Sequence, residues 1–242
     1  MDIQPNKIAY ITGISSGIGH ALALTLLDAN YFVYGIGRSN NIKHANFEFI
    51  LLDLRKVETV QNFNFRQVTA TERILINNAG MVGEILPVGE LSATSISEVM
   101  NVNTIAPQIL INTFIQTFSN QKGSLHILNI SSGAGKRAID AWATYCASKA
   151  ALDMFAETVK LEMELREKKD FHIHSVAPGV VDTAMQAQIR AASPDKFKMS
   201  QHFHDLKNKG ELVSPVHVAE KLLGLIKNPS NYPNNILSLD DI

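Results

Sequence analysis

The sequence is poor in the features that mark secreted, membrane and nucleic-acid-binding proteins. Its single cysteine, Cys146, excludes an intramolecular disulfide and is typical of a chain in a reducing cytoplasm. No apolar run reaches the roughly 18 residues that a membrane span requires, and the N-terminal segment MDIQPNKIAYITG lacks the layout of a signal peptide. The net charge is −1 and no basic patch stands out. We therefore expect a cytoplasmic globular protein with no membrane or nucleic-acid partner.

Apolar sequence, by contrast, is abundant, since 45% of the 242 residues are hydrophobic and 19% are charged. The apolar residues gather in short uninterrupted runs, as in parallel strands covered on both faces. The predicted strands are 7–12, 31–37, 47–52, 73–80, 124–132, 171–179 and 234–239. The predicted helices are 17–29, 94–119, 142–168 and 215–227. This alternation predicts an α/β fold: a single doubly wound Rossmann-type domain over 1–242, with a mostly parallel seven-stranded sheet and helices on both faces.

Two segments between these elements carry weaker patterns. Residues 56–72 show little helical or strand periodicity, so a helix there has weak support. The polar stretch 183–212 contains Pro194 and Gly210 and has little strand character. We interpret that stretch as a helical excursion that forms a substrate lid.

A glycine-rich turn follows the first predicted strand. The segment TGISSGIG places Thr12, Gly13, Gly17 and Gly19 where the strand gives way to a helix. Glycines there permit a tight turn, and the free N–H groups of the helix N-terminus can then face a pyrophosphate. The spacing G-x-x-x-G-x-G differs from the common G-x-G-x-x-G motif, so a glycine-rich turn without a ligand is the alternative interpretation.

A tyrosine and a lysine stand four residues apart in the segment AWATYCASKAAL. On a helix, Tyr145 and Lys149 would project from one face about 6 Å apart along the axis, among small residues that leave room beside them. A neighbouring ammonium lowers the pKa of a phenol and makes it a more useful acid. A surface pair without function is the alternative, because this spacing also occurs by chance. Cys146, about 100° away around the helix, is interpreted as a small packing residue.

Further segments, in order along the chain, indicate a known family. The glycine-rich turn is followed by NNAG at 77–80, NVN at 101–103, NISS at 129–132, Y-x-x-x-K at 145–149, and APG with VDT between 177 and 183. With these segments the chain closely resembles the short-chain dehydrogenase/reductase family over essentially its whole length. The resemblance implies an enzyme that transfers hydride between a nicotinamide cofactor and a carbonyl carbon.

The resemblance implies four catalytic residues and no metal. Tyr145 would protonate the carbonyl oxygen, Lys149 would favour the phenolate and hold the nicotinamide ribose, and Ser132 would donate a hydrogen bond to the same oxygen. Asn103 would hold a water that resupplies protons through Lys149. A polar residue bonded to the backbone is the compatible alternative for Asn103.

The cofactor implied by the resemblance is NADPH or NADP+. Members that prefer NAD carry an acidic residue at the end of the second strand, where this chain has Gly37 followed by Arg38. A guanidinium suits the 2′-phosphate of NADPH, and a solvated loop arginine is the alternative. Asn77 would line the adenosine side or have a purely structural role. The implied cofactor-binding residues are Gly13, Ser15, Ser16, Gly17, Ile18, Gly19, Arg38, Ser39, Asp53 (at the adenine edge), Leu54, Asn78, Ala79, Gly80, Tyr145, Lys149, Pro178, Gly179, Val181 and Thr183.

The distal third most resembles sepiapterin reductases and benzil-type dicarbonyl reductases, through the segments WATYCASKAALDM, APGVVDTAMQ, LKNKGELV and LSLDD. The expected partner is thus a small carbonyl substrate, either a dicarbonyl or a pterin side-chain ketone. Asp240 would anchor a pterin, with a frayed terminal acid as the alternative. The short 38–76 region departs from the animal sepiapterin reductases and leaves the substrate open. The implied substrate-binding residues are Ser132, Trp142, Tyr145, Met185, Gln186 and Asp240, and Trp142 is equally open to a packing role.

Two other functions remain as alternatives on the same fold. A 3-oxoacyl-carrier-protein reductase would need a basic docking surface, of which the sequence shows little sign. A non-catalytic NADP-sensing regulator would typically lack the tyrosine or the lysine. The long predicted helices 94–119 and 142–168 match those that pair in family dimers and tetramers, so we expect a homodimer or homotetramer.

Overall fold

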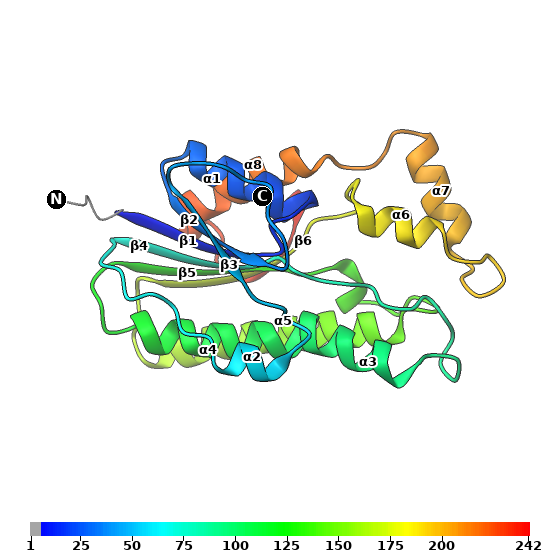
Figure 1. The fold of residues 1–242 in the computed structure, drawn as a ribbon, viewed down its shortest axis with the longest axis horizontal. Helices are drawn as coiled ribbons and strands as arrows, with labels where there is room; N and C mark the ends of the chain where they lie inside the picture. Colours follow the sequence, from blue (N-terminus) through cyan, green and yellow to red (C-terminus); the bar gives the residue numbers. More distant parts are fainter. Residues whose placement is uncertain (1–5) are drawn as a thin grey trace.

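The computed structural model describes residues 6–242 and has one parallel sheet at its centre (Figure 1). The strands are β1 (Lys7–Thr12), β2 (Phe32–Gly37), β3 (Phe47–Leu51), β4 (Glu72–Asn77), β5 (Ser124–Ile130), β6 (Phe171–Ala177) and β7 (Ile236–Ser238). Their order across the sheet is β3-β2-β1-β4-β5-β6-β7. Every neighbouring pair is parallel, so the sheet expected to be mostly parallel is parallel throughout the described chain. The strand order reverses between β1 and β4, the place where open α/β sheets bind ligands.

Helices cover both faces of the sheet (Figure 1). On one face α1 (Gly17–Asp28) and α8 (Pro215–Lys227) pack against each other. The other face carries α2 (Val57–Gln61), α3 (Ala93–Met100), α4 (Ala106–Phe118) and α5 (Ala143–Leu165). This arrangement confirms the doubly wound α/β class. None of the helices within residues 6–242 is long and apolar enough to cross a membrane.

The side chains of β1 explain why the apolar runs are uninterrupted. Side chains alternate along a strand, so Ala9 and Ile11 join the core that includes α1 and α8, while Ile8 and Tyr10 join the core that includes α4 and α5. All four are fully buried. A strand covered on both faces accepts apolar residues at every position, as the sequence pattern indicated.

The helix predicted over 94–119 is interrupted in the structure. A π-helical turn, Asn101–Ile105, separates α3 from α4. Pro107 lies in the first turn of α4 and has no N–H, so the carbonyl of Asn103 loses the donor that an uninterrupted α-helix would supply. Such turns are frequent at functional sites. This one positions Asn103 between the sheet and α5.

The segment expected to form a lid is helical. It contains α6 (Ala184–Arg190) and α7 (Ser200–Asn208), which project beyond the end of the sheet in Figure 1. An apolar cluster anchors it, because Ile189, Phe197 and Phe203 pack with Trp142 and Tyr145 of the main body. That the segment opens and closes over a substrate stays a prediction.

Candidate active site

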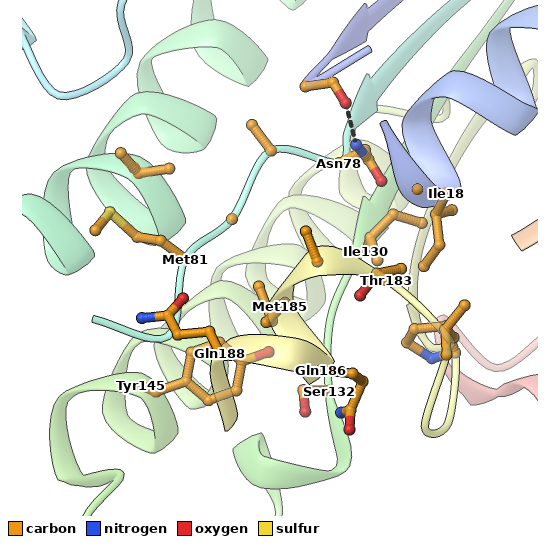
Figure 2. A pocket seen from close by; sticks show the side chains of 18 of the residues that line it. Ile18, Asn78, Met81, Ile130, Ser132, Tyr145, Thr183, Met185, Gln186 and Gln188 are labelled. Carbon is orange, nitrogen blue, oxygen red and sulfur yellow. Dashed lines mark hydrogen bonds between the residues drawn. The ribbon is translucent and has the colours of Figure 1, made fainter. Parts of the chain in front are cut away.

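A cavity of about 650 Å³ lies at the carboxyl ends of β1, β2, β4, β5 and β6. The β1–α1 turn, the ends of β2 and β3, the start of α5 and the segment before α6 all contribute to its lining. In Figure 2, Asn78 and Ile18 lie on one side, and Tyr145, Ser132 and Gln186 on the other. The position at the strand-order reversal is where the fold places ligands.

Most of the residues predicted from the sequence meet at this cavity. One residue of each implied group does not line the cavity. These exceptions are Gly19 among the cofactor-binding residues, Asn103 among the catalytic residues and Asp240 among the substrate-binding residues. The implied residues that do line it are Gly13, Ser15, Ser16, Gly17, Ile18, Arg38, Ser39, Asp53, Leu54, Asn78, Ala79, Gly80, Ser132, Trp142, Tyr145, Lys149, Pro178, Gly179, Val181, Thr183, Met185 and Gln186.

The β1–α1 turn brings backbone close to the cavity. Gly13 and Gly17 have φ angles of 76° and 60°, in the left-handed region that favours glycine. Gly19 has a packing role, since a Cβ there would lie 2.2 Å from Asn78 Nδ2 and 2.4 Å from the carbonyl oxygen of Gly13. The Ser16 N-cap makes no side-chain hydrogen bond to the helix, which leaves the first-turn N–H groups of α1 without that cap. The turn therefore suits an anion held close to the main chain.

The NNAG segment is tied to this turn. Asn78 Nδ2 donates to the carbonyl oxygens of Thr12 and Gly13 at 2.9 and 3.1 Å, and one of these bonds is drawn in Figure 2. The hydroxyl of Thr12 accepts from the backbone N–H groups of Asn78 and Ala79, both at 3.0 Å. Asn77 is buried and donates to Asn129 Oδ1 at 2.9 Å, away from the cavity lining. Of its two interpretations, the structural one fits this position.

The ends of β2 and β3 carry three charged side chains at the cavity. Arg38 is exposed at its edge. Arg55 donates from Nε and Nη2 to the carboxylate of Asp53, with a shortest N–O distance of 2.6 Å. The Arg55 guanidinium lowers the pKa of Asp53 to about 2, and Arg38 acts in the same direction. The carboxylate expected at the adenine edge is therefore ionised and already held by an arginine that the sequence patterns did not indicate.

Helix α5 carries the tyrosine and the lysine on one buried face. Lys149 Nζ donates to the carbonyl oxygen of Ile130 at 2.8 Å and lies 5.8 Å from the centroid of the Tyr145 ring. Burial lowers the pKa of Lys149 to about 8. Burial also raises the pKa of Tyr145, and the Ser132 hydroxyl acts in the opposite direction. The expected lowering of the Tyr145 pKa by Lys149 is not seen, because burial raises this pKa and the Lys149 ammonium is bonded to the main chain.

The side chains of Asn103 and Lys149 both approach Gly80. Asn103 Oδ1 accepts from the N–H of Met81 at 2.9 Å, and Asn103 Nδ2 donates to the carbonyl of Met81 at 2.9 Å and to the Ser148 hydroxyl at 3.0 Å. The Asn103 side chain is therefore satisfied by the protein, as the structural interpretation predicted. Gly80 lies between the two polar groups, since a Cβ there would be 3.5 Å from Asn103 Oδ1 and 3.6 Å from Lys149 Nζ.

Aromatic side chains form one wall of the cavity near Tyr145. Trp142 is buried, stacks on Phe197 and Phe203 at 5.6 Å between ring centroids, and meets Tyr145 edge-on at 5.4 Å. It therefore both packs and lines the cavity. Gln186 is 7% exposed, its Oε1 has no hydrogen-bond partner among the described residues, and it lines the same cavity as Ser132 (Figure 2).

The structure does not bring Asp240 to the cavity. Its side chain is exposed in a short turn after β7, and it is absent from the lining. The turn is held by Asp241, whose carboxylate accepts from the N–H and hydroxyl of Ser238. That Asp240 contacts a substrate stays a prediction, which its exposed position outside the cavity lining does not favour.

Several lining residues were not predicted from the sequence. Ile189 and Phe203 come from α6 and α7, whose packing on Trp142 follows no local pattern. Arg137 comes five residues after Ser132. Its position beyond the carboxyl end of a predicted strand could have indicated that it lines the cavity. The further lining residues include Met81, Ile139 and Gln188. Within residues 6–242 no group of three or more His, Cys, Asp or Glu side chains is arranged to hold a metal ion.

Comparisons with known proteins agree with this geometry. The family model described as short chain dehydrogenase matches residues 7–194. A benzil reductase ((S)-benzoin forming) of Bacillus cereus is 33% identical over 250 residues, covering 97% of this chain and 100% of that protein. A sepiapterin reductase of Rattus norvegicus is 30% identical over 245 residues, covering 91% of each. The solved structure of a putative NAD(P) dependent gluconate 5-dehydrogenase from Beutenbergia cavernae, with bound NADP at low occupancy, matches with a TM-score of 0.80 and 25% identity over 96% of this chain and 94% of that one.

Proposed function

The chain belongs to the short-chain dehydrogenase/reductase family, and we propose that it is an NADPH-dependent reductase of small ketones and dicarbonyls. One observation carries the proposal. Ser132, Tyr145 and Lys149 meet at one end of a cavity whose other end is formed by the glycine-rich β1–α1 turn. A carbonyl oxygen near Ser132 and Tyr145 would then lie beside a bound dinucleotide.

The residues of the cavity fit a nicotinamide dinucleotide. The backbone at Gly13 and Gly17 and the first turn of α1 would hold the pyrophosphate. Lys149 would bind the nicotinamide ribose, and the segment from Pro178 to Thr183 would close over the ring. When bound, the cofactor supplies the hydride.

Tyr145 would hold the proton that the carbonyl oxygen receives. Burial raises its pKa, so the hydroxyl carries its proton at neutral pH. The Ser132 hydroxyl would donate a second hydrogen bond to the same oxygen and so fix its position. Lys149 would stabilise the phenolate left after transfer. We propose that a water over Gly80, between Asn103 and Lys149, returns the proton.

The preference for NADPH rests on the charge at the end of β2. Arg38 is exposed at the cavity edge, and Gly37 occupies the place where an acidic residue would bind both ribose hydroxyls. A guanidinium forms paired hydrogen bonds with a phosphate and would attract the 2′-phosphate of NADPH.

A vicinal diketone with an aromatic group fits the substrate end. Trp142 and Phe203 offer aromatic surface, and the buried carboxamide of Gln186, which lines the same cavity as Ser132, offers a polar contact. The relative in Bacillus cereus is named for benzil, a diketone of this kind. A pterin ketone is a second substrate of the same class, favoured by the sepiapterin reductase similarity but not by the position of Asp240.

The outer face of α5 supports a homo-oligomer. Met154, Leu161 and Leu165 recur at helical spacing and are 62%, 56% and 77% exposed. A second copy of the chain would cover this apolar stripe. Sedimentation of the wild-type protein and of Leu161→Glu would test the assignment, because a monomeric wild type removes it.

The substrate class is tested by assaying NADPH oxidation with benzil, sepiapterin and an acetoacetyl thioester. We expect turnover with benzil, weaker turnover with sepiapterin, and little with the thioester. Matched assays of Ser132→Ala should show the loss that a substrate-positioning hydroxyl predicts. If none of the three carbonyls oxidises NADPH above the rate without enzyme, the proposed function is wrong.

A further inference from the structure

Asp153 lies on the same helical face as the catalytic pair. It follows Lys149 by four residues and Tyr145 by eight, so the three side chains project from one side of α5. Asp153 is 9% exposed, although its helix presents many exposed positions on the opposite side. A carboxylate is seldom buried unless something requires its charge there. It does not line the cavity, so neither a cofactor nor a substrate explains it.

The turn after Ser132 closes over this carboxylate. A Cβ on Gly135 would lie 3.0 Å from Asp153 Oδ2 and 3.0 Å from the main-chain carbonyl carbon of Lys149. Gly135 therefore packs against both the Asp153 carboxylate and the α5 backbone at Lys149, one helical turn before Asp153. Asp153 Oδ1 makes no regular hydrogen bond within the described residues. The charge is thus shielded from water without being neutralised by a direct contact.

The buried ammonium of Lys149 has no ion-pair partner among the described residues, and the negative charge of Asp153 can stabilise it. The lysine is 4% exposed, and its ammonium donates to a neutral carbonyl, that of Ile130. No ion pair within 4.0 Å involves Lys149 in the part of the chain that the structure describes. Burial lowers the pKa of Lys149 to about 8, and the negative charge of Asp153 acts in the opposite direction.

The polar and charged neighbours of Asp153 favour its ionised form, against the effect of burial. Burial raises its pKa, while the hydroxyls of Ser131 and Ser175 and the charges of Lys149 and Lys136 act against that rise. Ser131 precedes the substrate-binding Ser132, and Ser175 on β6 accepts a hydrogen bond from Asn129 at 3.2 Å. Polar or charged groups from the segment after β5 (Ser131 and Lys136), from β6 (Ser175) and from α5 (Lys149) therefore act on this carboxylate.

We propose that Asp153 is a positioning residue, a buried negative charge that holds Lys149 in its ammonium form during turnover. The inference rests on the proposed reductase function. Without the carboxylate, Lys149 would give up its proton more readily, and its stabilising effect on the Tyr145 phenolate would be lost at lower pH.

The test compares wild type with Asp153→Asn, which keeps size and shape but removes the charge. We expect the alkaline fall of kcat for ketone reduction to begin about one pH unit lower in the variant, while kcat on the acid side of the fall stays within about twofold. Glu157→Gln, one turn further along α5 on an exposed position, removes the same charge and should leave the profile unchanged. A kcat that drops equally at all pH values would overturn the proposal, because it would indicate a purely structural role.

A second readout separates this proposal from the reductase function. The ionisation of Lys149 can be followed by NMR of 13C-labelled lysine side chains, with the signal assigned by Lys149→Arg. Its titration should move to lower pH by about one unit in Asp153→Asn, whatever carbonyl the enzyme reduces. Asp153→Ser, a smaller uncharged variant, should give the same shift if the asparagine variant folds poorly. An unchanged Lys149 titration would refute the role of Asp153, whereas a shifted titration in an enzyme that reduces no carbonyl would refute only the proposed function.

Discussion

The side chain of Lys149 passes 5.8 Å from the ring centroid of Tyr145 and ends in a 2.8 Å hydrogen bond to the carbonyl oxygen of Ile130. This bond ties the start of α5 to the end of β5, two residues before Ser132. The lysine and the tyrosine are thus held by one helix, and the serine closely follows the strand to which that helix is bonded. Rigid elements of this kind hold a reacting group in place without ordering it at each turnover.

The pH dependence of reduction should follow Lys149. Since burial lowers its pKa to about 8, the ammonium loses its proton as the pH rises through that value. We expect kcat for ketone reduction to be constant below this value and to fall above it. The check is a pH profile of kcat at saturating NADPH. A profile that stays flat well above pH 8 would mean that the charge on Lys149 does not support the proton transfer.

Cofactor preference should depend on Arg38. If this guanidinium binds the 2′-phosphate, NADPH should bind at least about tenfold tighter than NADH, which is about 1.4 kcal/mol. Arg38→Asp should reverse the preference, and Arg137→Asp, at the cavity but away from the β2 end, serves as the charge-matched control. The measurement is fluorescence titration with both cofactors. Equal affinity of the wild type for NADPH and NADH would contradict the assignment.

The two candidate substrate contacts, Gln186 and Asp240, should respond differently to substitution. Gln186→Leu removes a buried carboxamide that lines the cavity and should raise KM for a diketone about tenfold or more. Asp240→Asn alters an exposed turn outside the cavity and should leave KM unchanged for both a diketone and a pterin. Steady-state kinetics on both substrates decide the matter. A selective rise of KM for the pterin in Asp240→Asn would show that the chain end reaches the substrate after all.

Features that depend on residues close together in the sequence were predicted, whereas features that depend on tertiary packing were not. Tyr145 and Lys149 were predicted because helical spacing is local, and Gly13 and Gly17 because a left-handed turn demands glycine. Because these motifs follow parallel strands, whose carboxyl ends lie at the same edge of the sheet, they were also expected to lie close together. Phe203 and Ile189 could not be predicted, because their place depends on how α6 and α7 pack against Trp142.

Two differences between the expected and the observed structure have visible causes. The interruption of the helix at Asn101–Ile105 was signalled by Pro107, which lies inside the predicted helix and cannot donate to the Asn103 carbonyl. The turn that carries Asp240 is held by the capping interaction of Asp241 with Ser238, three residues earlier, and this local S-x-x-D pattern was not used as a signal. The resemblance to pterin-binding relatives carried no information about that turn.

Stability in acid should be limited by a histidine cluster far from the cavity lining. His126 Nε2 and His174 Nδ1 are 3.0 Å apart, and burial lowers the pKa of His126, His172 and His174. Below the ordinary histidine pKa of about 6.5, the unfolded chain therefore binds more protons than the folded one. The free energy of unfolding should be fully present above that pH and should decrease as the pH falls below it.

Urea denaturation at a series of pH values tests this slope. His126→Gln stays neutral at all pH values and can still bond to His174, so its stability should depend less steeply on pH between about 6.5 and 5 than that of the wild type. Identical slopes in the two proteins would exclude the cluster as the cause.

The central claim is that Tyr145 donates the proton in an NADPH-dependent carbonyl reduction. Its most direct test is single-turnover oxidation of bound NADPH by benzil in wild type and Tyr145→Phe, with NADPH affinity measured in parallel. The substitution removes only a hydroxyl from a buried ring, so the variant should fold and bind NADPH like the wild type while the rate falls by about a thousandfold or more, on the order of 4 kcal/mol. A variant that binds NADPH and oxidises it at close to the wild-type rate would show that another group donates the proton.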